Sequence, residues 1–421
     1  MAHFYCFTCH CICDRIIIWV LLTKRKETNS IIMETATEVN AKKKPLTRFG
    51  EFELLKAIAI LGLPAVHLLE EAVEGGFADP SLMKFGTFVI GLCAFGLSVF
   101  MICMGFGIGG GRNKPDGIMR NGIQFLLIGA ILNIFRWLIP GIIQSVVVDK
   151  NIWDDVEFCL ESDIYYFVGL FYIFYSILLR LKIQTPGLLL TSIVTLSLNT
   201  LLTPLTSAHI TNPIVAALVG NIVYVNETSC FPLLSWAVFP TVGIILGEVL
   251  KKTNEEQREN IMKRVLDISG VLFFSFIVFL WTYHIDIEKA LVSPANDYIT
   301  DLPNVVLLIS LALFTISIAY HLCKHIGASK FMGFMLRISA FIIPFYLAQW
   351  IIIAWIFYIM EIVDVPVECY TPLWYFGCVV VVTLICIFIA IKHGMKLMKV
   401  LLKITTIKTK KKKKDKKNEK K

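Results

Sequence analysis

The sequence predicts an all-α integral membrane protein of about ten transmembrane helices, with its N- and C-termini on the cytoplasmic side. Of its 421 residues, 56% are hydrophobic and only 17% are charged, and the mean hydropathy is +0.71. Charged residues make up about a quarter of an average soluble domain, so a soluble globular fold is excluded. Apolar runs recur along the chain, and the connections between them alternate between basic and acidic.

Each of the apolar runs has about 18 to 25 residues, which is enough to cross a bilayer as a helix. We expect spans at 52–72, 84–108, 118–139, 162–180, 185–204, 231–250, 264–284, 303–323, 336–360 and 373–392. Arg112, Lys114 and Arg120 follow the second span, and Asp154 and Asp155 follow the third. Because basic residues favour the cytoplasmic side, this alternation places both termini there.

The chain divides into three parts: a polar segment at 1–47, a multi-pass domain at 48–392, and a tail at 393–421 that is amphipathic and then almost all lysine. The net charge of +8 is largely due to this tail. Beside a membrane helix, such a tail is expected to lie against anionic cytoplasmic lipid. A merely solvated tail is the equal alternative, and no nucleic-acid partner is expected.

The cysteines near the N-terminus do not predict a metal site. They are Cys6, Cys9, Cys11 and Cys13. Their spacing matches no standard zinc pair.

Met33 offers a second possible start of translation, which leaves open whether residues 1–32 are translated. Cys159, Cys230 and Cys369 fall in expected outer connections, where they are candidates for pairing. Residues 205–230 hold a short apolar piece that is expected to lie in the interface or to re-enter the membrane.

The first span carries the most informative polar residues. They are Glu53, Lys56, His67, Glu70 and Glu71. At about 100° per residue, Lys56 lies about 20° from His67, and Glu53 and Glu71 lie about 40° away, so they form one stripe. Ionisable groups within a membrane helix are costly and usually face a functional site. The alternative is a helix end whose long side chains reach the headgroups, which explains Lys56 and Glu70 better than His67.

Pro64 interrupts the same helix just before the histidine. A proline has no N–H to donate to the carbonyl four residues earlier, here that of Ile60. We therefore expect a kink or a polar notch directly beneath His67.

Glycines end the second span in the sequence GFGIGGG, residues 105–111. This contains G-x-G-x-x-G, but a dinucleotide site needs a strand before that motif and a helix after it, whereas here a membrane helix precedes it. We therefore expect the glycines to permit close approach of another helix backbone. The nearby Arg112, Lys114 and Arg120 are candidates to hold the phosphates of a cytosolic donor, or are simply topology anchors.

Later spans contain further polar residues among apolar neighbours. Asn133 and Arg136 lie in the third span, Asp163 opens the fourth, and Gln349 lies in the ninth. Arg136 falls in the outward half, so we expect a carboxylate partner for it. The tryptophans of the last two spans, Trp350, Trp355 and Trp374, are expected to belong at least partly to an aromatic belt at the membrane interface.

The residues of the first span resemble the membrane acyltransferase superfamily, meaning the acyltransferase-3 proteins and relatives of the heparan-α-glucosaminide N-acetyltransferase type. In FELLKAIAILGLPAVH, Glu53 matches the acidic residue of the family's first helix, Lys56 stands where arginine is usual, and His67 matches the histidine. Further similar segments are 99–109, 119–133, 162–173, 231–250 and 338–350. The family's Arg-x-x-Arg pair after the second span is missing here.

The resemblance implies transfer of an acyl group, usually acetyl from acetyl-CoA, to a hydroxyl or amine of a glycan or lipid-linked sugar. It implies that His67 is the general base, with Glu70, Glu71 or Glu53 orienting it; an acyl-histidine intermediate is the open alternative. Lys56 to His67 is about 16 Å along a helix, comparable to a pantetheine arm. Candidate donor-binding residues are Lys56, Arg48, Arg112, Lys114 and Arg120. Candidate acceptor-binding residues are Asn133, Arg136, Asp163, Trp236 and Gln349.

Two other function classes remain open from the sequence. One is a transporter or flippase in which Glu53, His67 and Arg136 relay protons or bind substrate. The other is a catalytically inactive membrane partner of an envelope synthesis complex. The acyltransferase is the preferred hypothesis, acting in the cell membrane.

Overall fold

The computed structural model describes residues 49–111, 114–148, 159–160, 163–226, 229–283, 302–327, 329–366 and 370–405, with the backbone alone for 74, 83–95 and 302. The segment Met1–Phe49 forms a unit apart from Gly50–Lys421, and all of the helices below belong to the second unit. Arg48, Arg112, Cys369, the cysteines near the N-terminus and the poly-lysine tail lie outside the described residues.

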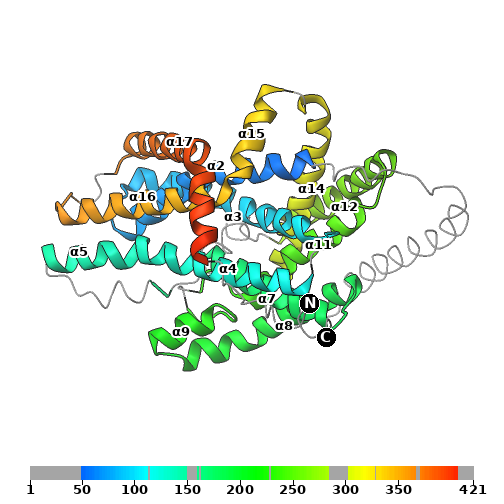
Figure 1. Cartoon of the computed structure of the whole chain (residues 1–421), viewed down its shortest axis with the longest axis horizontal. Coiled ribbons are helices and arrows are strands. Elements are labelled where there is room, and N and C mark those ends of the chain that lie inside the picture. Colours follow the sequence, from blue (N-terminus) through cyan, green and yellow to red (C-terminus); the bar gives the residue numbers. More distant parts are fainter. Residues whose placement is uncertain are drawn as a thin grey trace, which may run out of the picture. The chain divides into compact units, whose positions relative to one another are not determined.

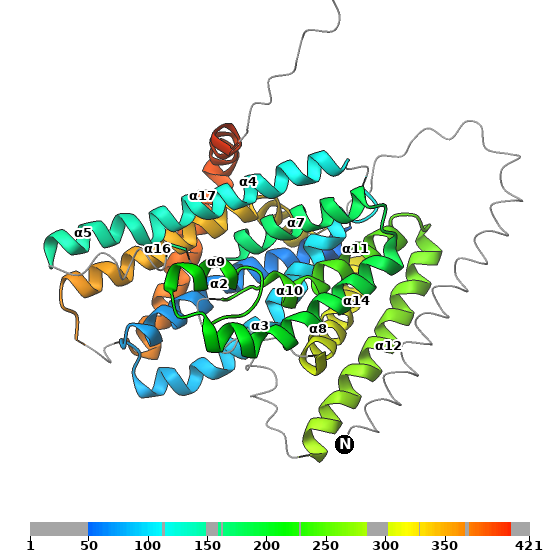
Figure 2. The same ribbon diagram turned by 90° about the horizontal axis from the view of Figure 1, so that it is seen from below.

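The described part is helical. Its elements are α2 (Gly50–Glu74), α3 (Pro80–Ile108), α4 (Pro115–Asn133), η1 (Ile134–Leu138), α5 (Ile139–Val147), α7 (Ile164–Arg180), α8 (Thr185–His209), α9 (Pro213–Gly220), α10 (Leu233–Trp236), α11 (Val238–Leu250), α12 (Glu255–Thr282), α14 (Leu302–Ile326), α15 (Lys330–Ala340), α16 (Ile342–Ile362) and α17 (Pro372–Thr405). Figures 1 and 2 show their arrangement.

In the described residues, 8 helical segments are long and apolar enough to cross a membrane. They are Gly50–Val73, Pro115–Val147, Thr185–His209, Leu233–Leu250, Glu255–Thr282, Pro303–Ile326, Ile342–Ile362 and Pro372–Thr405. Shorter apolar helices, Gly96–Ile108 and Ile164–Arg180, occupy the other two expected positions. The multi-pass helical architecture is confirmed, while the count of ten and the side on which the termini lie remain predictions.

Three spans differ in detail from their expected extents. The third runs on to Val147 and contains a π-helical turn, η1. The ninth is divided into α15 and α16 at Phe341, whose backbone leaves the helical region (φ −115°, ψ 30°). The long connection at 205–230 is shortened because α8 continues to His209 and α9 forms within it.

Helix α2 lies at the centre of the packing. It contacts α3, α14, α15, α16 and α17. At its start, Phe52 stacks on Phe106 of α3 with ring centroids 3.6 Å apart. We call the end of the bundle at which α2 begins the Gly50 end, and the opposite end the Glu74 end. The polar stripe of α2 is therefore surrounded by other helices instead of facing lipid.

Glycines bring α3 and α11 into backbone contact, as expected from the GFGIGGG segment. A Cβ atom built at Gly105 would lie 1.9 Å from the carbonyl oxygen of Pro240, and one built at Gly109 would lie 2.3 Å from that of Ile244. Conversely, a Cβ atom at Gly243 would lie 2.0 Å from the carbonyl oxygen of Ile102. Small residues spaced four apart allow this approach between membrane helices.

Local sequence signals explain where several helices begin. Asp79 accepts hydrogen bonds from the backbone N–H groups of Ser81 and Leu82 at the start of α3, and Asp163 accepts one from Tyr165 at the start of α7. Asn254 and Gln257 form a reciprocal capping box at the start of α12. Each of these side chains satisfies a backbone donor that has no partner within its own helix.

Candidate active site

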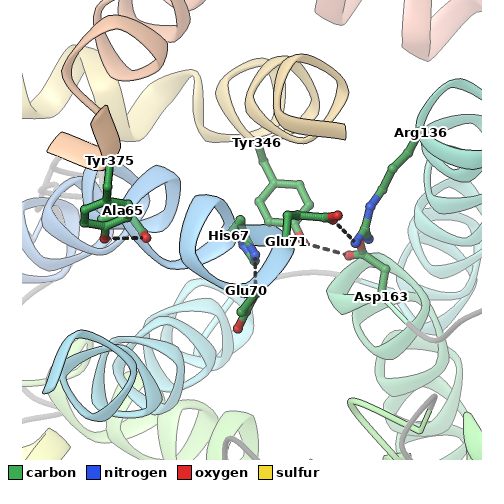
Figure 3. A network of polar contacts seen from close by, with 8 residues as sticks. All are labelled: Ala65, His67, Glu70, Glu71, Arg136, Asp163, Tyr346 and Tyr375. Carbon is green, nitrogen blue, oxygen red and sulfur yellow. Dashed lines mark hydrogen bonds and ion pairs between the residues drawn. The ribbon is translucent and has the colours of Figure 1, made fainter. Parts of the chain in front are cut away.

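His67 lies near the Glu74 end of α2 and faces the protein. Its Nδ1 atom is 2.9 Å from Oε2 of Glu70, one helical turn further on (Figure 3). Its side chain is 13% exposed, and its buried Nε2 atom has no hydrogen-bond partner among the residues that the structure describes. In the tautomer whose Nδ1–H donates a hydrogen bond to the carboxylate, Nε2 carries the free lone pair.

Two aromatic side chains of α16 cover the imidazole. The ring centroid of Trp350 lies 3.8 Å from that of His67, at an interplanar angle of 42°. Tyr346 approaches edge-on, with its centroid 6.3 Å away. Trp350 is 5% exposed, so the expectation that it belongs to an aromatic belt is wrong. Trp374 is 67% exposed and is consistent with such a belt.

Arg136 has the carboxylate partner that the sequence predicted. Its guanidinium Nη2 lies 3.3 Å from Oε1 of Glu71, and both side chains are largely buried (Figure 3). The guanidinium carbon also lies 3.4 Å from the ring centroid of Trp350 and 4.2 Å from that of Trp137. The indole of Trp350 thus contacts both the imidazole and the guanidinium, and α2, η1 and α16 meet around it.

A π-helical turn carries Arg136 to this position. In η1 the N–H of Ile139 bonds to the carbonyl of Ile134, five residues earlier, so one extra residue is accommodated. Both Arg136 and Trp137 are buried as a result. The indole N–H of Trp355 donates to the carbonyl of Phe135, at 3.1 Å. Single π-helical turns often occur at functional sites.

Asp163 joins α7 to the same cluster. It is buried, caps α7, and accepts a hydrogen bond of 2.9 Å from the hydroxyl of Tyr346 (Figure 3). Tyr375 of α17 donates to the carbonyl of Ala65, next to Pro64, at 2.7 Å. Helix α2 continues through Pro64 without interruption. The hydroxyl of Tyr375 is thus a hydrogen-bond donor from another helix, and it lies beside the proline.

The other candidate acceptor-binding residues have different surroundings. Asn133 is buried and donates to the carbonyl of Cys159, at 3.0 Å. Gln349 is fully buried, and neither amide atom has a hydrogen-bond partner within the described residues. Trp236 packs against Phe231 and Phe239, with ring centroids 5.6 Å and 5.2 Å away.

The pairing of the cysteines expected in outer connections stays a prediction. Cys230 is buried and Cys159 is partly buried. Their possible partner Cys369 lies outside the described residues.

The remaining polar residues of α2 form a second group at the Gly50 end. Lys56 pairs with Glu53 at 3.1 Å, and Glu53 also accepts a hydrogen bond from Ser339 at the end of α15. Glu51 is buried and pairs with Arg258 of α12. Glu53 precedes His67 by about 21 Å along the helix. The structure therefore does not bring Glu53 to the imidazole.

A cavity of about 310 Å³ lies at the Gly50 end, at the ends of α3, α7 and α11 and the start of α4. Its lining comprises Ile108, Gly110, Gly111, Ile118, Tyr175, Leu179, Glu248 and Lys252. Lys114 and Arg120 are exposed on the first turns of α4. His67 does not belong to this lining.

Sequence reasoning missed Trp350, Tyr346 and Trp137 as components of the site. The signal for the first two was present, since Tyr346 and Trp350 are four residues apart and share a helix face beside the polar Gln349. The π-helical turn that turns Trp137 inward had no comparable signal.

These features define a multi-pass helical membrane protein with a charged site enclosed among its helices. The chain belongs to the acyltransferase-3 family: the model of this family, described as an acyltransferase domain, matches residues 49–392. The protein is accordingly a membrane acyltransferase. Comparison with curated proteins and with solved structures gave no match.

Proposed function

We propose that this membrane acyltransferase resides in the cell membrane and transfers an acetyl group from acetyl-CoA to a hydroxyl or amine of a cell-surface glycan or lipid-linked sugar. One observation carries the assignment of the reacting site. The Nε2 atom of His67 is buried without a partner among the described residues, while Nδ1 is held by Glu70. An imidazole held in this way is suited to remove a proton from an acceptor.

The proposed reaction uses the two nitrogens of His67 differently. Nε2 takes the proton of the acceptor hydroxyl or amine while the acceptor atom bonds to the acyl carbon. The carbon–sulfur bond then breaks, and the departing sulfur takes the proton from Nε2. Glu70 stabilises the imidazolium that exists between these steps. In the alternative route, Nε2 itself attacks the acyl carbon, the carbon–sulfur bond breaks with release of the CoA thiolate, and the acceptor then attacks the acyl-histidine and releases Nε2. Both routes need the same free atom.

Arg136, Glu71 and Trp350 would hold the site in shape. The guanidinium is paired with Glu71 and lies against the indole that contacts His67. Movement of Arg136 would therefore shift Trp350 against the imidazole. Because the pair is enclosed by helices, it also keeps the surroundings of His67 polar without exposing them to lipid.

The Gly50 end offers groups that fit a phosphorylated donor. Lys252 and the backbone of Gly110 and Gly111 line the cavity there, and a lysine is a suitable partner for a phosphate. The volume is at the lower end of ligand pockets, about 300 to 1,000 Å³. Lys114 and Arg120 would add charge from α4. The thioester supplied by acetyl-CoA would be the acyl source.

The test is acetyl transfer by purified His67→Ala protein reconstituted in lipid. We expect the rate of acetyl-CoA consumption to fall by about 10²- to 10⁴-fold, as for loss of a general base, with normal insertion and thermal stability. The matched control is His209→Ala, because His209 is exposed and contacts only the carbonyl of Leu205 of its own helix in the hydrogen bonds described.

Full acetyl transfer by the His67→Ala protein would refute the assignment of the site. Substrate uptake that depends on His67, with no acetyl transfer in any variant, would instead support a transporter. Mass spectrometry of surface glycans with and without the gene would identify the acceptor.

A further inference from the structure

Helix α17 is longer than a membrane crossing needs. It has 34 residues, or about 51 Å at 1.5 Å per residue, whereas the hydrocarbon core is about 30 Å thick. Its apolar first part ends at Ile391, and the remaining residues, Lys392–Thr405, alternate lysines with apolar residues. Helix α17 contacts α4 as well as α2, α15 and α16, and Figure 1 shows its last turns passing across α4.

Lysines line one face of this extension. They are Lys392, Lys396, Lys399 and Lys403. Their spacing of four, three and four residues places them within about 60° of one another around the helix. All are exposed, and none forms an ion pair with a residue that the structure describes. The sequence of α17 contains no acidic residue. We call this row the lysine face.

The opposite side of the extension packs on the protein. A Cβ atom at Gly394 would lie 2.7 Å from the ring of Phe341, at the junction of α15 and α16. Leu401 and Thr405 are buried as well. These contacts fix the rotation of the helix and direct the lysine face away from the protein.

Exposed apolar residues flank the lysine face. Met395 is 59% exposed and Ile404 is 64% exposed, and they project on either side of the lysine row at helical spacing. The Nζ atom of Lys392 lies 4.8 Å from the ring centroid of Phe388, one helical turn earlier, so this ammonium lies over an aromatic ring at the end of the apolar part of α17. Lysines combined with apolar flanks are typical of helices that lie at a membrane surface.

We propose that the lysine face of α17 binds the headgroups of anionic phospholipids. The extension continues the apolar first part of α17 without a break, and its apolar flanks favour an orientation along the lipid surface, in which all four charges would lie within about one Debye length, 8 to 10 Å, of the headgroups. A soluble acidic partner would leave the apolar flanks in water, whereas a lipid surface accepts both. This inference is independent of the proposed reaction at His67.

The test measures the reactivity of individual lysines in the full-length protein. The protein is placed in nanodiscs of phosphatidylcholine alone or of phosphatidylcholine with phosphatidylglycerol, and a water-soluble amine reagent is added. Labelling of Lys396, Lys399 and Lys403 is read by peptide mass spectrometry. We expect labelling about fivefold slower at each of them in the anionic discs at low salt, and restored at high salt.

Variants separate the lysine face from the lysine-rich tail. A triple variant should lower the enrichment of phosphatidylglycerol in the lipid that co-purifies with the protein from mixed discs. Its substitutions are Lys396→Gln, Lys399→Gln and Lys403→Gln. The same three positions changed to arginine should retain the enrichment. The matched control changes Lys410, Lys411 and Lys412 to glutamine, which removes equal charge and should leave most of the enrichment in place.

Equal labelling in both kinds of disc would overturn the proposal, since the lysine face would then be merely solvated. Protection by added RNA or polyglutamate in neutral discs, without protection by phosphatidylglycerol, would overturn it in favour of a soluble acidic partner. Loss of enrichment in the tail control alone would assign lipid binding to the tail instead.

Discussion

At the scale of single residues, Glu70 determines how His67 is presented. The two side chains are three residues apart on α2 and bond through Nδ1, a contact that the helix itself brings about. In the proposed reaction the carboxylate would select which nitrogen keeps a proton, and it would stabilise the imidazolium. We therefore propose Glu70 as a positioning residue that acts through His67.

Glu70→Gln tests this role. The amide keeps the size of the side chain but removes the charge, so kcat is expected to fall by up to about 100-fold, while the KM for acetyl-CoA and the thermal stability change little. The control is Glu259→Gln, which neutralises an exposed carboxylate paired with Lys324. A rise in KM with unchanged kcat would contradict the assignment, because it would place Glu70 in donor binding.

A double-mutant cycle tests how much the Glu71–Arg136 ion pair stabilises the protein. Arg136→Gln or Glu71→Gln alone leaves an uncompensated charge among the helices, and is expected to destabilise the folded protein by about 3 kcal/mol. The double variant should lose less than the sum of the two single losses. Thermal unfolding in detergent measures all three. Additive losses would show that the two side chains do not stabilise each other.

At the scale of helices, the glycines shared by α3 and α11 decide how closely these helices approach. Gly105 and Gly109 of α3 lie against the backbone carbonyls of Pro240 and Ile244, and Gly243 and Gly247 of α11 lie against those of Ile102 and Phe106. Lys251 adds a second link, because its ammonium donates to carbonyls at the end of α3, including that of Phe106 at 2.7 Å. Burial lowers the pKa of Lys251.

Gly243→Ala is expected to destabilise the protein by about 1 to 3 kcal/mol, because the added methyl group has no space and the two helices must separate. The matched control is Gly107→Ala in the same region, where a Cβ atom would meet nothing within 4 Å. Thermal unfolding compares the two variants. Equal unfolding temperatures for both would refute the close-contact explanation.

At the scale of the whole molecule, the segments that connect the helices, and the contacts beside them, lie in two sets at opposite ends of the bundle. The Gly50 end joins α12 to α2 through Arg258 and Glu51, and α7 to α4 through Arg180 and Asp116. The Glu74 end includes the contact of Ala78 with Tyr370. Basic residues gather at the first of these ends, which predicts that it faces the cytoplasm.

Site-directed thiol labelling tests this orientation. In a background without the 12 native cysteines, Val363→Cys should react with an impermeant reagent in intact cells, whereas Glu256→Cys should react only after permeabilisation. Both positions are exposed, so burial does not confuse the comparison. The reverse pattern would invert the predicted topology.

The sequence predicted most of the architecture, because the length and hydropathy of each run are local properties. It named Glu70, together with Glu71 and Glu53, as a candidate to orient His67, and it predicted that Arg136 needs a carboxylate. It did not single out Glu71 as that partner, since the two are 65 positions apart along the chain and only packing brings them together. It placed Glu53 with His67, because the angle of a residue around the helix axis contains no information on its position along that axis.

Aromatic residues were the hardest to interpret. A tryptophan near a membrane interface has the same local sequence signal whether it faces headgroups or a neighbouring helix. Trp350 is buried and Trp374 is exposed, a difference that depends on how α16 and α17 pack. The π-helical turn at Arg136 likewise depends on its tertiary partners, among them the indole of Trp355.

The contact between the rings of Trp350 and His67, whose centroids lie 3.8 Å apart, gives the protein a natural optical reporter. A protonated imidazole in contact with an indole quenches its emission, so each gain or loss of a proton at His67 should alter the fluorescence of one tryptophan among the 8 in the chain. Subtracting the spectrum of Trp350→Phe isolates that signal. Rapid mixing with a donor or an acceptor would then time the proton movements directly, without any attached dye.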